Sequence, residues 1–289
     1  MKLVNFVKNG KNTLGILTDR GVADVSEISG ANAPATMREA LTMGREGSVR
    51  ALSEAAGRAV RFLGAEEIEY APVMDDPEKI LCVGKNYVAH AAEVPELFDY
   101  ERTAPDIFAK FRNTLVGHGG TVRLNPNSKK HDYEAEIAVV IGRRASNVSA
   151  GEALGYVFGY TLANDISARD LQKAASQWTP GKTCDTFCPL GPCLVTAEEI
   201  AYDRLLLTGY KNGELRQTGR SGDMIYSIPY IVSFLSRCCT LEPGDVILTG
   251  TPAGVIFGRP EGEQDWLKAG DELTVHVDEI GTLTVRVEE

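Results

Sequence analysis

The stretch Asp132-Tyr133-Glu134-Ala135-Glu136-Ile137-Ala138-Val139-Val140-Ile141-Gly142 has the alternation of a β-strand that packs against a core. At a period of two, one face carries Ala135, Ile137, Val139 and Ile141, most of which are β-branched. The opposite face begins with Glu134 and Glu136 and continues with apolar residues. We therefore predict a core strand that starts with two carboxylates on the same face.

Two neighbouring carboxylates at the start of an apolar strand can be interpreted in two ways. Side by side they repel each other and raise each other's pKa, so the arrangement is favourable when a cation lies between them. The simpler interpretation is a strand end that is exposed to solvent. Other residues of the chain favour the cation.

Composition restricts the class of protein. The 289 residues have an ordinary hydrophobic content of 43% and a formal net charge of −10, which argues against a broad surface for nucleic acid or anionic membrane. No apolar run reaches the roughly 20 residues of a membrane span, and the N-terminus lacks the features of a signal peptide. The six cysteines include no C-x-x-C pair and are interpreted as reduced thiols, which together with the missing export signal predicts a cytoplasmic protein.

The chain is predicted to have two parts. Residues 1–75 resemble a small α+β module, with strands near 3–7 and 14–18 around an Asn9-Gly10 turn and helices near 36–41 and 48–62. Thr36 and Ser48 are the expected N-caps of these helices. A proline-rich link at 71–77 marks the boundary, and residues 76–289 form the catalytic part. No residue of the first part suggests chemistry, so its expected role is support or a wall of the cleft.

A third carboxylate follows a second long strand. Residues 155–164 are apolar and β-prone, Asp165 comes directly after them, and a helix is expected next with Ser167 as its N-cap. The junction of a strand and a helix is a common place for a site residue. Glu134, Glu136 and Asp165 would offer oxygen ligands alone, which suits Mg²⁺ or Mn²⁺ better than Zn²⁺ or Cu²⁺.

A candidate base lies in the segment 85–93, which is expected to be helical. His90 and Glu93 would share a helix face, where the carboxylate can hold and polarise the imidazole. A surface pair of the same spacing is the alternative, and a Cys82–His90 nucleophilic pair is less favoured because Cys82 lies in an apolar strand. His118 and His131 are expected to be structural or to contact solvent.

Two further features could serve a substrate, and one segment could be mobile. Lys182 lies in a loop rich in glycine and proline, where it could bind a substrate carboxylate or a developing enolate. The hydroxyl of Thr251 and the backbone amides near it, in the glycine-rich segment after a buried strand, could hold a carboxylate. The polar segment 96–105 is a candidate mobile element.

These motifs, taken together, resemble the fumarylacetoacetate hydrolase family over residues 78–288, and in extent the smaller bacterial members of 2-hydroxyhepta-2,4-diene-1,7-dioate isomerase-like or acylpyruvase-like type. The motifs that carry the resemblance are Cys82-Val83-Gly84-Lys85-Asn86-Tyr87 with His90 and Glu93, Tyr133-Glu134-Ala135-Glu136, Asn164-Asp165-Ile166-Ser167-Ala168-Arg169-Asp170, Lys182, Gly191-Pro192, Asn212-Gly213-Glu214 and Thr249-Gly250-Thr251-Pro252.

The resemblance implies a mostly β, α+β roll of mixed sheets, usually a homodimer. It implies metal ligation by Glu134, Glu136 and Asp165, and a catalytic pair of His90 and Glu93 on a segment that closes over substrate. The substrate contacts that it implies are Arg169, Gln172, Lys182 and Thr251. One departure stands out: fumarylacetoacetate hydrolase itself has an acidic metal ligand before the histidine, whereas Leu81-Cys82-Val83 offers none, so fumarylacetoacetate is an improbable substrate.

The resulting hypothesis is a hydrolase, dependent on Mg²⁺ or Mn²⁺, that cleaves the C–C bond of an acylpyruvate such as fumarylpyruvate through a metal-bound pyruvate enolate. His90 would activate the attacking water and Lys182 would stabilise the oxyanion. A 2-hydroxyhepta-2,4-diene-1,7-dioate isomerase and an oxaloacetate decarboxylase use the same enolate and remain alternatives. A retaining glycosidase and a structural Ca²⁺-binding protein are rivals from other classes.

Overall fold

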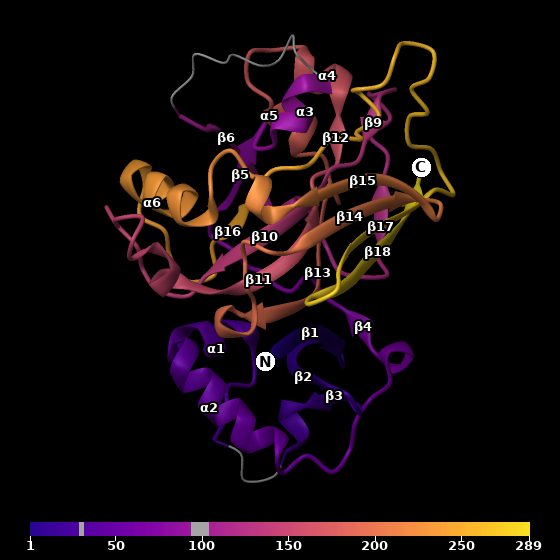
Figure 1. The fold of residues 1–289 in the computed structure, drawn as a ribbon. Helices are drawn as coiled ribbons and strands as arrows, with labels where there is room; N and C mark the ends of the chain where they lie inside the picture. The colour runs from indigo at the N-terminus through magenta and orange to yellow at the C-terminus, as the bar shows by residue number, and fades with distance from the viewer. Residues whose placement is uncertain (29–31, 94–103) are drawn as a thin grey trace.

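The computed structural model describes residues 1–28, 32–93 and 104–289, and most of them belong to β-sheets or to the loops between strands (Figure 1). The large sheet has the order β3-β2-β1-β13-β11-β10-β16-β5-β6, with β4 beside β1 and β7 beside β13. Its strands are β1 (Lys2–Lys8), β2 (Lys11–Thr18), β3 (Gly21–Asp24), β4 (Glu69–Tyr70), β5 (Ile80–Gly84), β6 (Asp106–Lys110), β7 (Leu115–Val116), β10 (Ala135–Ile141), β11 (Val157–Asn164), β13 (Cys188–Thr196) and β16 (Val246–Leu248).

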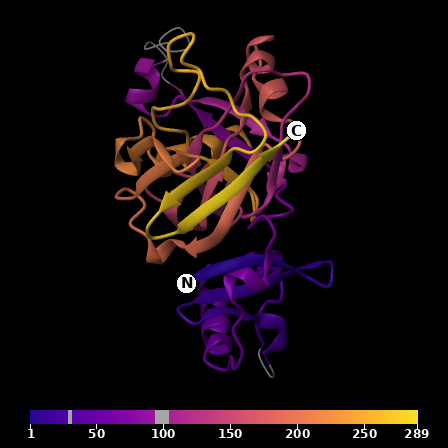
Figure 2. The ribbon, with the colours of Figure 1, turned by 90° about the vertical axis from the view of Figure 1, so that its right-hand side faces the viewer.

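A second sheet packs against the first and closes the roll. Its order is β15-β14-β17-β18-β8, and β17 and β18 run across the face that Figure 2 turns toward the viewer. The strands are β8 (Thr121–Arg123), β14 (Leu206–Lys211), β15 (Glu214–Arg220), β17 (Glu272–Val277) and β18 (Gly281–Glu288), and a short separate ladder joins β9 (His131–Asp132) to β12 (Ser167–Ala168). The predicted mostly β fold with mixed sheets is confirmed.

Helices are few and short. They are α1 (Met37–Met43), α2 (Arg45–Ala56), α3 (Val88–Glu93), α4 (Arg169–Lys173), α5 (Thr179–Lys182) and α6 (Ile228–Cys238). Short 3₁₀ turns connect other elements at Val25–Glu27, Ala65–Glu67, Arg112–Thr114, Ala153–Tyr156, Ala197–Glu199 and Ser221–Asp223. No helix of the described ranges is both long and apolar enough to cross a membrane.

Strand β10 is the centre of the molecule. It pairs with β11 on one side and with β16 on the other, and each of its residues is buried. Ala135, Ile137, Val139 and Ile141 lie in one core cluster, whereas Ala138 and Val140 lie in the cluster on the other side of the sheet. Alternate residues of this strand therefore belong to two different hydrophobic cores, because protein covers both faces of the strand.

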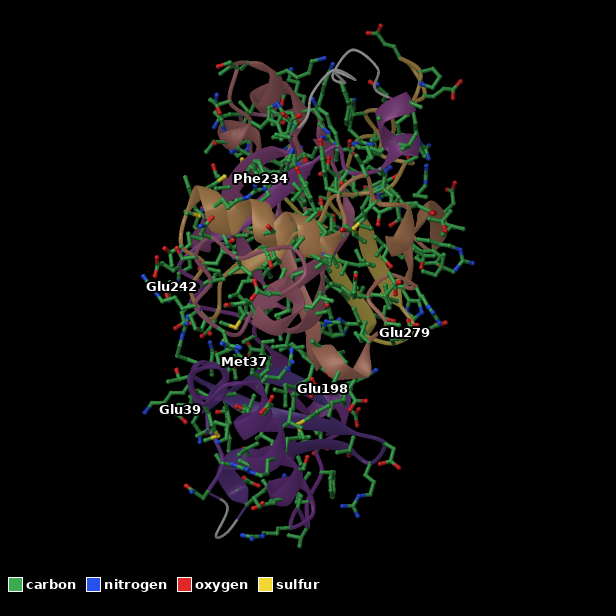
Figure 3. All side chains as sticks on the ribbon, turned by 60° about the vertical axis from the view of Figure 1, so that its left-hand side comes forward. Met37, Glu39, Glu198, Phe234, Glu242 and Glu279 are labelled. Carbon is green, nitrogen blue, oxygen red and sulfur yellow. The ribbon has the colours of Figure 1, made fainter. Side chains whose placement is uncertain are left out.

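The N-terminal elements form the lower lobe in Figure 1 and are joined to the large sheet. β1 pairs with β13 antiparallel through Lys2 and Leu3. Met37, at the start of α1, belongs to the same core cluster as Phe158 of β11, and Arg45 makes an ion pair of 3.3 Å with Glu198. Met37 and Glu198 both lie near the junction of the two lobes (Figure 3). A division of the chain at residue 75 stays a prediction.

Two of the expected helix starts are wrong. α2 begins after Gly44, and the Ser48 hydroxyl instead donates a buried hydrogen bond to the carbonyl of Ala40; the helix ends at Ala56 rather than near residue 62. Ser167 does not cap α4 but pairs with Asp132 in the β9–β12 ladder, so that the helix begins at Arg169. The Ser167 hydroxyl donates to the nearby carbonyl of Asp165, and neither serine caps a helix, since a hydroxyl that can cap can equally bond elsewhere.

Other local predictions are confirmed. Thr36 caps α1 by accepting the backbone N–H of Glu39. Asn9-Gly10 and Asn212-Gly213 form the turns of the β1–β2 and β14–β15 hairpins, with both residues of each turn at positive φ. The polar segment 96–105 falls almost entirely outside the described residues.

Candidate active site

The three predicted carboxylates meet at the ends of β10 and β11. Ala135 pairs with Asn164 in the ladder, and beyond this pair the backbone N–H of Asp165 donates to the carbonyl of Glu134 over 2.8 Å. This pairing brings Asp165 beside the start of β10, so that ligand atoms of Glu134, Glu136 and Asp165 all lie within 4.8 Å of one another. All three residues are buried, with at most 7% of their surface exposed. A solvent-exposed strand end is thereby excluded.

Buried cations surround this carboxylate set. Lys182 Nζ, at the end of α5, lies 2.7 Å from Glu134 Oε2 and 2.8 Å from Asp165 Oδ2. Lys110 Nζ, at the end of β6, lies 2.5 Å from the other oxygen of Asp165, and it also donates to the carbonyl of Ile166. The two lysines therefore hold Asp165 from both sides.

Arg169 completes the cation shell from the first turn of α4. Its guanidinium Nη2 lies 2.7 Å from Glu134 Oε1 and 2.8 Å from Asp132 Oδ2, while Nη1 donates to Gln172 Oε1 over 3.1 Å. Asp132 is itself fixed by the backbone amides of Ile256 and Phe257. Arg169 is thus oriented by Asp132 and Glu134 together.

Glu136 differs from the other two carboxylates, because no described residue supplies it with a cation. It accepts the backbone N–H of Gly250 over 2.6 Å, and within the described part of the chain no lysine, arginine or histidine forms an ion pair with it. Burial, and next the charges of Asp165 and Glu134, hold the pKa of Glu136 well above its ordinary value. The pKa of Glu134 moves the opposite way, because Lys182 and Arg169 more than offset the effect of its burial.

This imbalance fits a divalent cation. A buried carboxylate without a cationic partner is unfavourable, and a metal ion among the three residues would supply the missing positive charge. The donor set contains oxygen atoms alone, which Mg²⁺ and Mn²⁺ prefer. The carboxylate set can therefore hold a metal ion.

His90 and Glu93 form the expected pair on α3. His90 Nδ1 lies 2.8 Å from Glu93 Oε1, and the second oxygen of Glu93 accepts the backbone N–H of Gly254 over 2.9 Å. His90 is only 7% exposed, so this is not a surface ion pair. With Nδ1 bound to a carboxylate, Nε2 is the nitrogen left to act as a base. The alternative nucleophile, Cys82, is fully buried, and burial raises the pKa of its thiol well above the ordinary value.

One small cavity, of about 30 Å³, collects most of the predicted site residues. Asp165 and Glu93 stand behind it, in contact with Lys182 and His90. The predicted residues that line it are His90, Glu134, Glu136, Arg169, Gln172, Lys182 and Thr251. The sequence therefore predicted a set of residues that the fold brings together.

Thr251 and two histidines have defined partners. The Thr251 hydroxyl donates to the carbonyl of Ala135 and accepts from Gln217, so its hydrogen is already used within the protein. His118 and His131 each accept a backbone N–H, from Thr284 and Asn125 respectively. Both histidines lie outside the cavity lining.

Sequence reasoning did not assign a role to several residues that shape the site. Asp132 orients Arg169, and Lys110 orients Asp165. For Lys110 the sequence did offer a signal, since it is a charged residue in an otherwise apolar strand. Lys85, Phe108 and Trp178 line the cavity beside the predicted residues. Phe108 and Trp178 pack edge to face at 5.3 Å between ring centroids.

Comparisons with known proteins identify the family. The family model described as fumarylacetoacetate (FAA) hydrolase C-terminal matches residues 79–288. Oxaloacetate tautomerase YisK of Bacillus subtilis is 43% identical over 220 residues, which cover 75% of this chain and 72% of that protein.

Solved structures extend the similarity to the whole chain. A fumarylacetoacetate hydrolase from Exiguobacterium antarcticum has a TM-score of 0.86 at 32% identity, covering 100% of this chain and 99% of the other. A 2-hydroxyhepta-2,4-diene-1,7-dioate isomerase from Mycobacterium marinum has a TM-score of 0.76 at 31% identity, covering 99% and 98%. The chain belongs to the fumarylacetoacetate hydrolase family of enzymes.

Proposed function

We propose that this protein is a metal-dependent tautomerase that interconverts the keto and enol forms of oxaloacetate or a closely similar 2-oxo dicarboxylic acid. The observation that carries the proposal is that His90 lines the same cavity as the carboxylates Glu134 and Glu136. Glu93 holds His90 in position as a base. Tautomerisation needs a base that moves a proton at C3 and a positive field at the 2-oxygen. The 43% identity to YisK supports oxaloacetate as the substrate class.

The residues proposed to hold the metal are Glu134, Glu136 and Asp165, and the proposed ion is Mg²⁺ or Mn²⁺. When bound, such an ion supplies Lewis-acid polarisation of the 2-oxo group. Asp132, Lys110 and Arg169 keep the ligand carboxylates in position before the substrate enters.

The protein's own groups would move the proton. His90 Nε2 would accept the proton from C3 of the keto form, and the imidazolium, which Glu93 stabilises, would pass that proton to the 2-oxygen to complete the enol; the reverse reaction runs the same transfers backwards. Lys182 stabilises the negative charge that develops on the 2-oxygen. Arg169 and Gln172 orient the substrate, whereas Thr251 fixes the wall of the cavity through Ala135 and Gln217.

Hydrolysis of an acylpyruvate is the second candidate function. The same base could deprotonate a water molecule, and the departing enolate would develop its charge at the same oxygen. A relative that covers the whole chain is named a hydrolase, which favours this reaction over decarboxylation of oxaloacetate. The family membership and the pairing of the carboxylates with buried cations argue against a glycosidase.

The test follows the enol absorbance of oxaloacetate and the release of pyruvate in parallel. We expect rapid loss of enol without pyruvate in the presence of Mg²⁺ or Mn²⁺, and loss of this activity in EDTA and in His90→Ala. Pyruvate from oxaloacetate would instead indicate a decarboxylase, and pyruvate from acetylpyruvate or fumarylpyruvate a hydrolase. Activity that persists after removal of metal would contradict the proposed metal site.

Three other properties stay predictions. They are a cytoplasmic location, a homodimer, and a supporting role for residues 1–75. The expected partner is a small anionic 2-oxo acid rather than a nucleic acid or a membrane.

A further inference from the structure

Lys85 occupies a conspicuous position in the cavity. It follows β5 directly, and its side chain lines the cavity together with His90, Glu134 and Lys182. Its Nζ lies 2.9 Å from Asp106 Oδ2 and 5.2 Å from the centroid of the Trp178 ring, and 11% of the side chain is exposed. The ammonium thus lies at the aromatic wall of the site.

The backbone of Lys85 is strained. Its φ of +57° lies in the left-handed region, where a residue with a long side chain is uncommon. The other described non-glycine residues at positive φ are Asn9, Asn147, Thr186 and Asn212. Three of these are asparagines, which tolerate this conformation, and none of the four lines the cavity. Strain of this kind is retained where a side chain must be held in a particular place.

The neighbouring residues fix Lys85 in this place. Gly84 lies against Trp178 so closely that a Cβ atom there would be 2.5 Å from Cζ3 of the indole ring. Trp178 in turn packs against Phe108. The side chain of Lys85 is therefore confined between Trp178 and Asp106.

The distribution of charge assigns Lys85 a different task from the other cations. Among the described residues, three cationic side chains line the cavity: Lys85, Arg169 and Lys182. Arg169 is bound by Asp132 and Glu134, and Lys182 by Glu134 and Asp165. Lys85 makes no ion pair with this carboxylate set within the described ranges, so its charge is not committed to the metal ligands.

A dicarboxylic 2-oxo acid brings two negative groups into this cavity. The C1 carboxylate and the 2-oxo group would lie at the carboxylate set and its metal. The charges of Arg169 and Lys182 are already offset by protein carboxylates, so the distal carboxylate would be buried at a large cost unless a further cation meets it. We propose that Lys85 binds the distal carboxylate and so makes the site selective for dicarboxylic over monocarboxylic 2-oxo acids. The inference rests on the proposed function, since it assumes a 2-oxo acid at the carboxylate set.

The test compares two ligands that differ at the distal group alone. Oxaloacetate carries a carboxylate where 2-oxobutyrate carries a methyl group. Binding of each to the Mg²⁺-loaded protein is measured by calorimetry for the wild type, Lys85→Met, Lys85→Arg and the control Lys129→Met, which removes an exposed lysine outside the cavity. Methionine keeps the apolar stem that packs on Trp178 and removes the charge.

We expect the wild type and Lys129→Met to prefer oxaloacetate. In Lys85→Met the affinity for oxaloacetate should fall about 10- to 100-fold, the range of a lost charge-assisted hydrogen bond, while that for 2-oxobutyrate stays unchanged. Lys85→Arg should retain most of the preference. An equal loss for both ligands, or no loss for either, would overturn the assignment.

This readout separates the two proposals. Binding is measured without turnover, so a protein that prefers oxaloacetate through Lys85 but does not tautomerise it would refute the proposed reaction and leave the role of Lys85 intact. A tautomerase whose Lys85→Met variant binds both acids as the wild type does would refute the role of Lys85 alone. Unfolding curves of each variant exclude a loss of structure as the cause.

Discussion

The ammonium of Lys182 lies 2.7 Å from Glu134 Oε2, inside a cavity whose wall also carries the carboxylate of Glu136. Lys182 thus pairs with Glu134, just before β10, whereas Glu136 has no cationic partner among the described residues. The asymmetry between Glu134 and Glu136 leads to the first prediction.

Glu136→Gln should abolish metal binding and at the same time stabilise the metal-free protein. In the metal-free protein burial opposes the ionisation of Glu136, and glutamine carries no charge, so the metal-free variant should be more stable than the metal-free wild type by about 1 kcal/mol or more. Mn²⁺ should raise the melting temperature of the wild type and leave that of the variant unchanged. Calorimetric melting with and without Mn²⁺ measures both effects. A variant that is still stabilised by Mn²⁺ would show that Glu136 is not a ligand.

His90→Ala should lower kcat by about 10²- to 10⁴-fold, the usual contribution of a general base. Glu93→Gln should cause a smaller loss, because the imidazole remains but is no longer held by a charged group. Metal affinity should stay unchanged in both variants, since neither residue belongs to the carboxylate set. Steady-state kinetics with a parallel Mn²⁺ titration tests this. Weaker metal binding in His90→Ala would indicate a ligand role instead of a base.

Lys110→Met should destabilise the protein by about 3–5 kcal/mol, because it leaves Asp165 buried with one cation fewer. In the double variant Lys110→Met/Asp165→Asn the loss should be clearly smaller than the sum of the single losses. Urea unfolding of the four proteins in EDTA gives the coupling energy. Additive losses would mean that the 2.5 Å contact contributes nothing to stability.

Gly84→Ala should lower kcat/KM about tenfold or more, since the added methyl group displaces Trp178 from the cavity wall. Gly155→Ala is the matched control: a Cβ there meets nothing within 4 Å, and the activity should not change. Kinetics and the fluorescence of the two tryptophans follow the displacement. Equal activity of the two variants would argue that Trp178 does not shape the site.

His131 should make the protein less stable in mild acid. Burial lowers its pKa, although Asp170 acts in the opposite direction, and its Nε2 accepts the N–H of Asn125 only when unprotonated. The folded pKa therefore lies below the unfolded value of about 6.5. The stability it contributes is complete above that value and is lost as the pH falls toward the folded pKa.

His131→Gln keeps an acceptor without a titrating group. Between pH 7.5 and 5.5 the wild type should lose more free energy of unfolding than this variant, with a difference in slope of at most about 1.4 kcal/mol per pH unit. Urea unfolding at both pH values provides the comparison. Parallel losses in the two proteins would assign the acid sensitivity to other groups.

Local sequence signals were sufficient where a residue's role depends on its close neighbours. The alternation of residues 135–141 predicted the central strand, and the i,i+3 spacing predicted the contact of His90 with Glu93. The glycine turns after Asn9 and Asn212 followed from their need for positive φ. Ser48 and Ser167 were wrongly predicted to cap helices, because any serine before a helical segment gives the same local signal. That signal does not show that Ser48 bonds the carbonyl of Ala40 or that Ser167 belongs to a strand.

The sequence by itself determined the strand with its two carboxylates, the third carboxylate at the end of the next strand, and the histidine with its carboxylate partner. The tertiary structure alone decided which charges are paired. Lys110 is 55 residues from Asp165 in the sequence, Asp132 is 37 residues from Arg169, and Lys182 is 17 residues from Asp165. Such contacts depend on which strands pair and in which register, and no local pattern encodes them. Only that arrangement shows that Glu136 has no cationic partner in the described ranges and that Lys85 pairs with Asp106 rather than with the metal ligands.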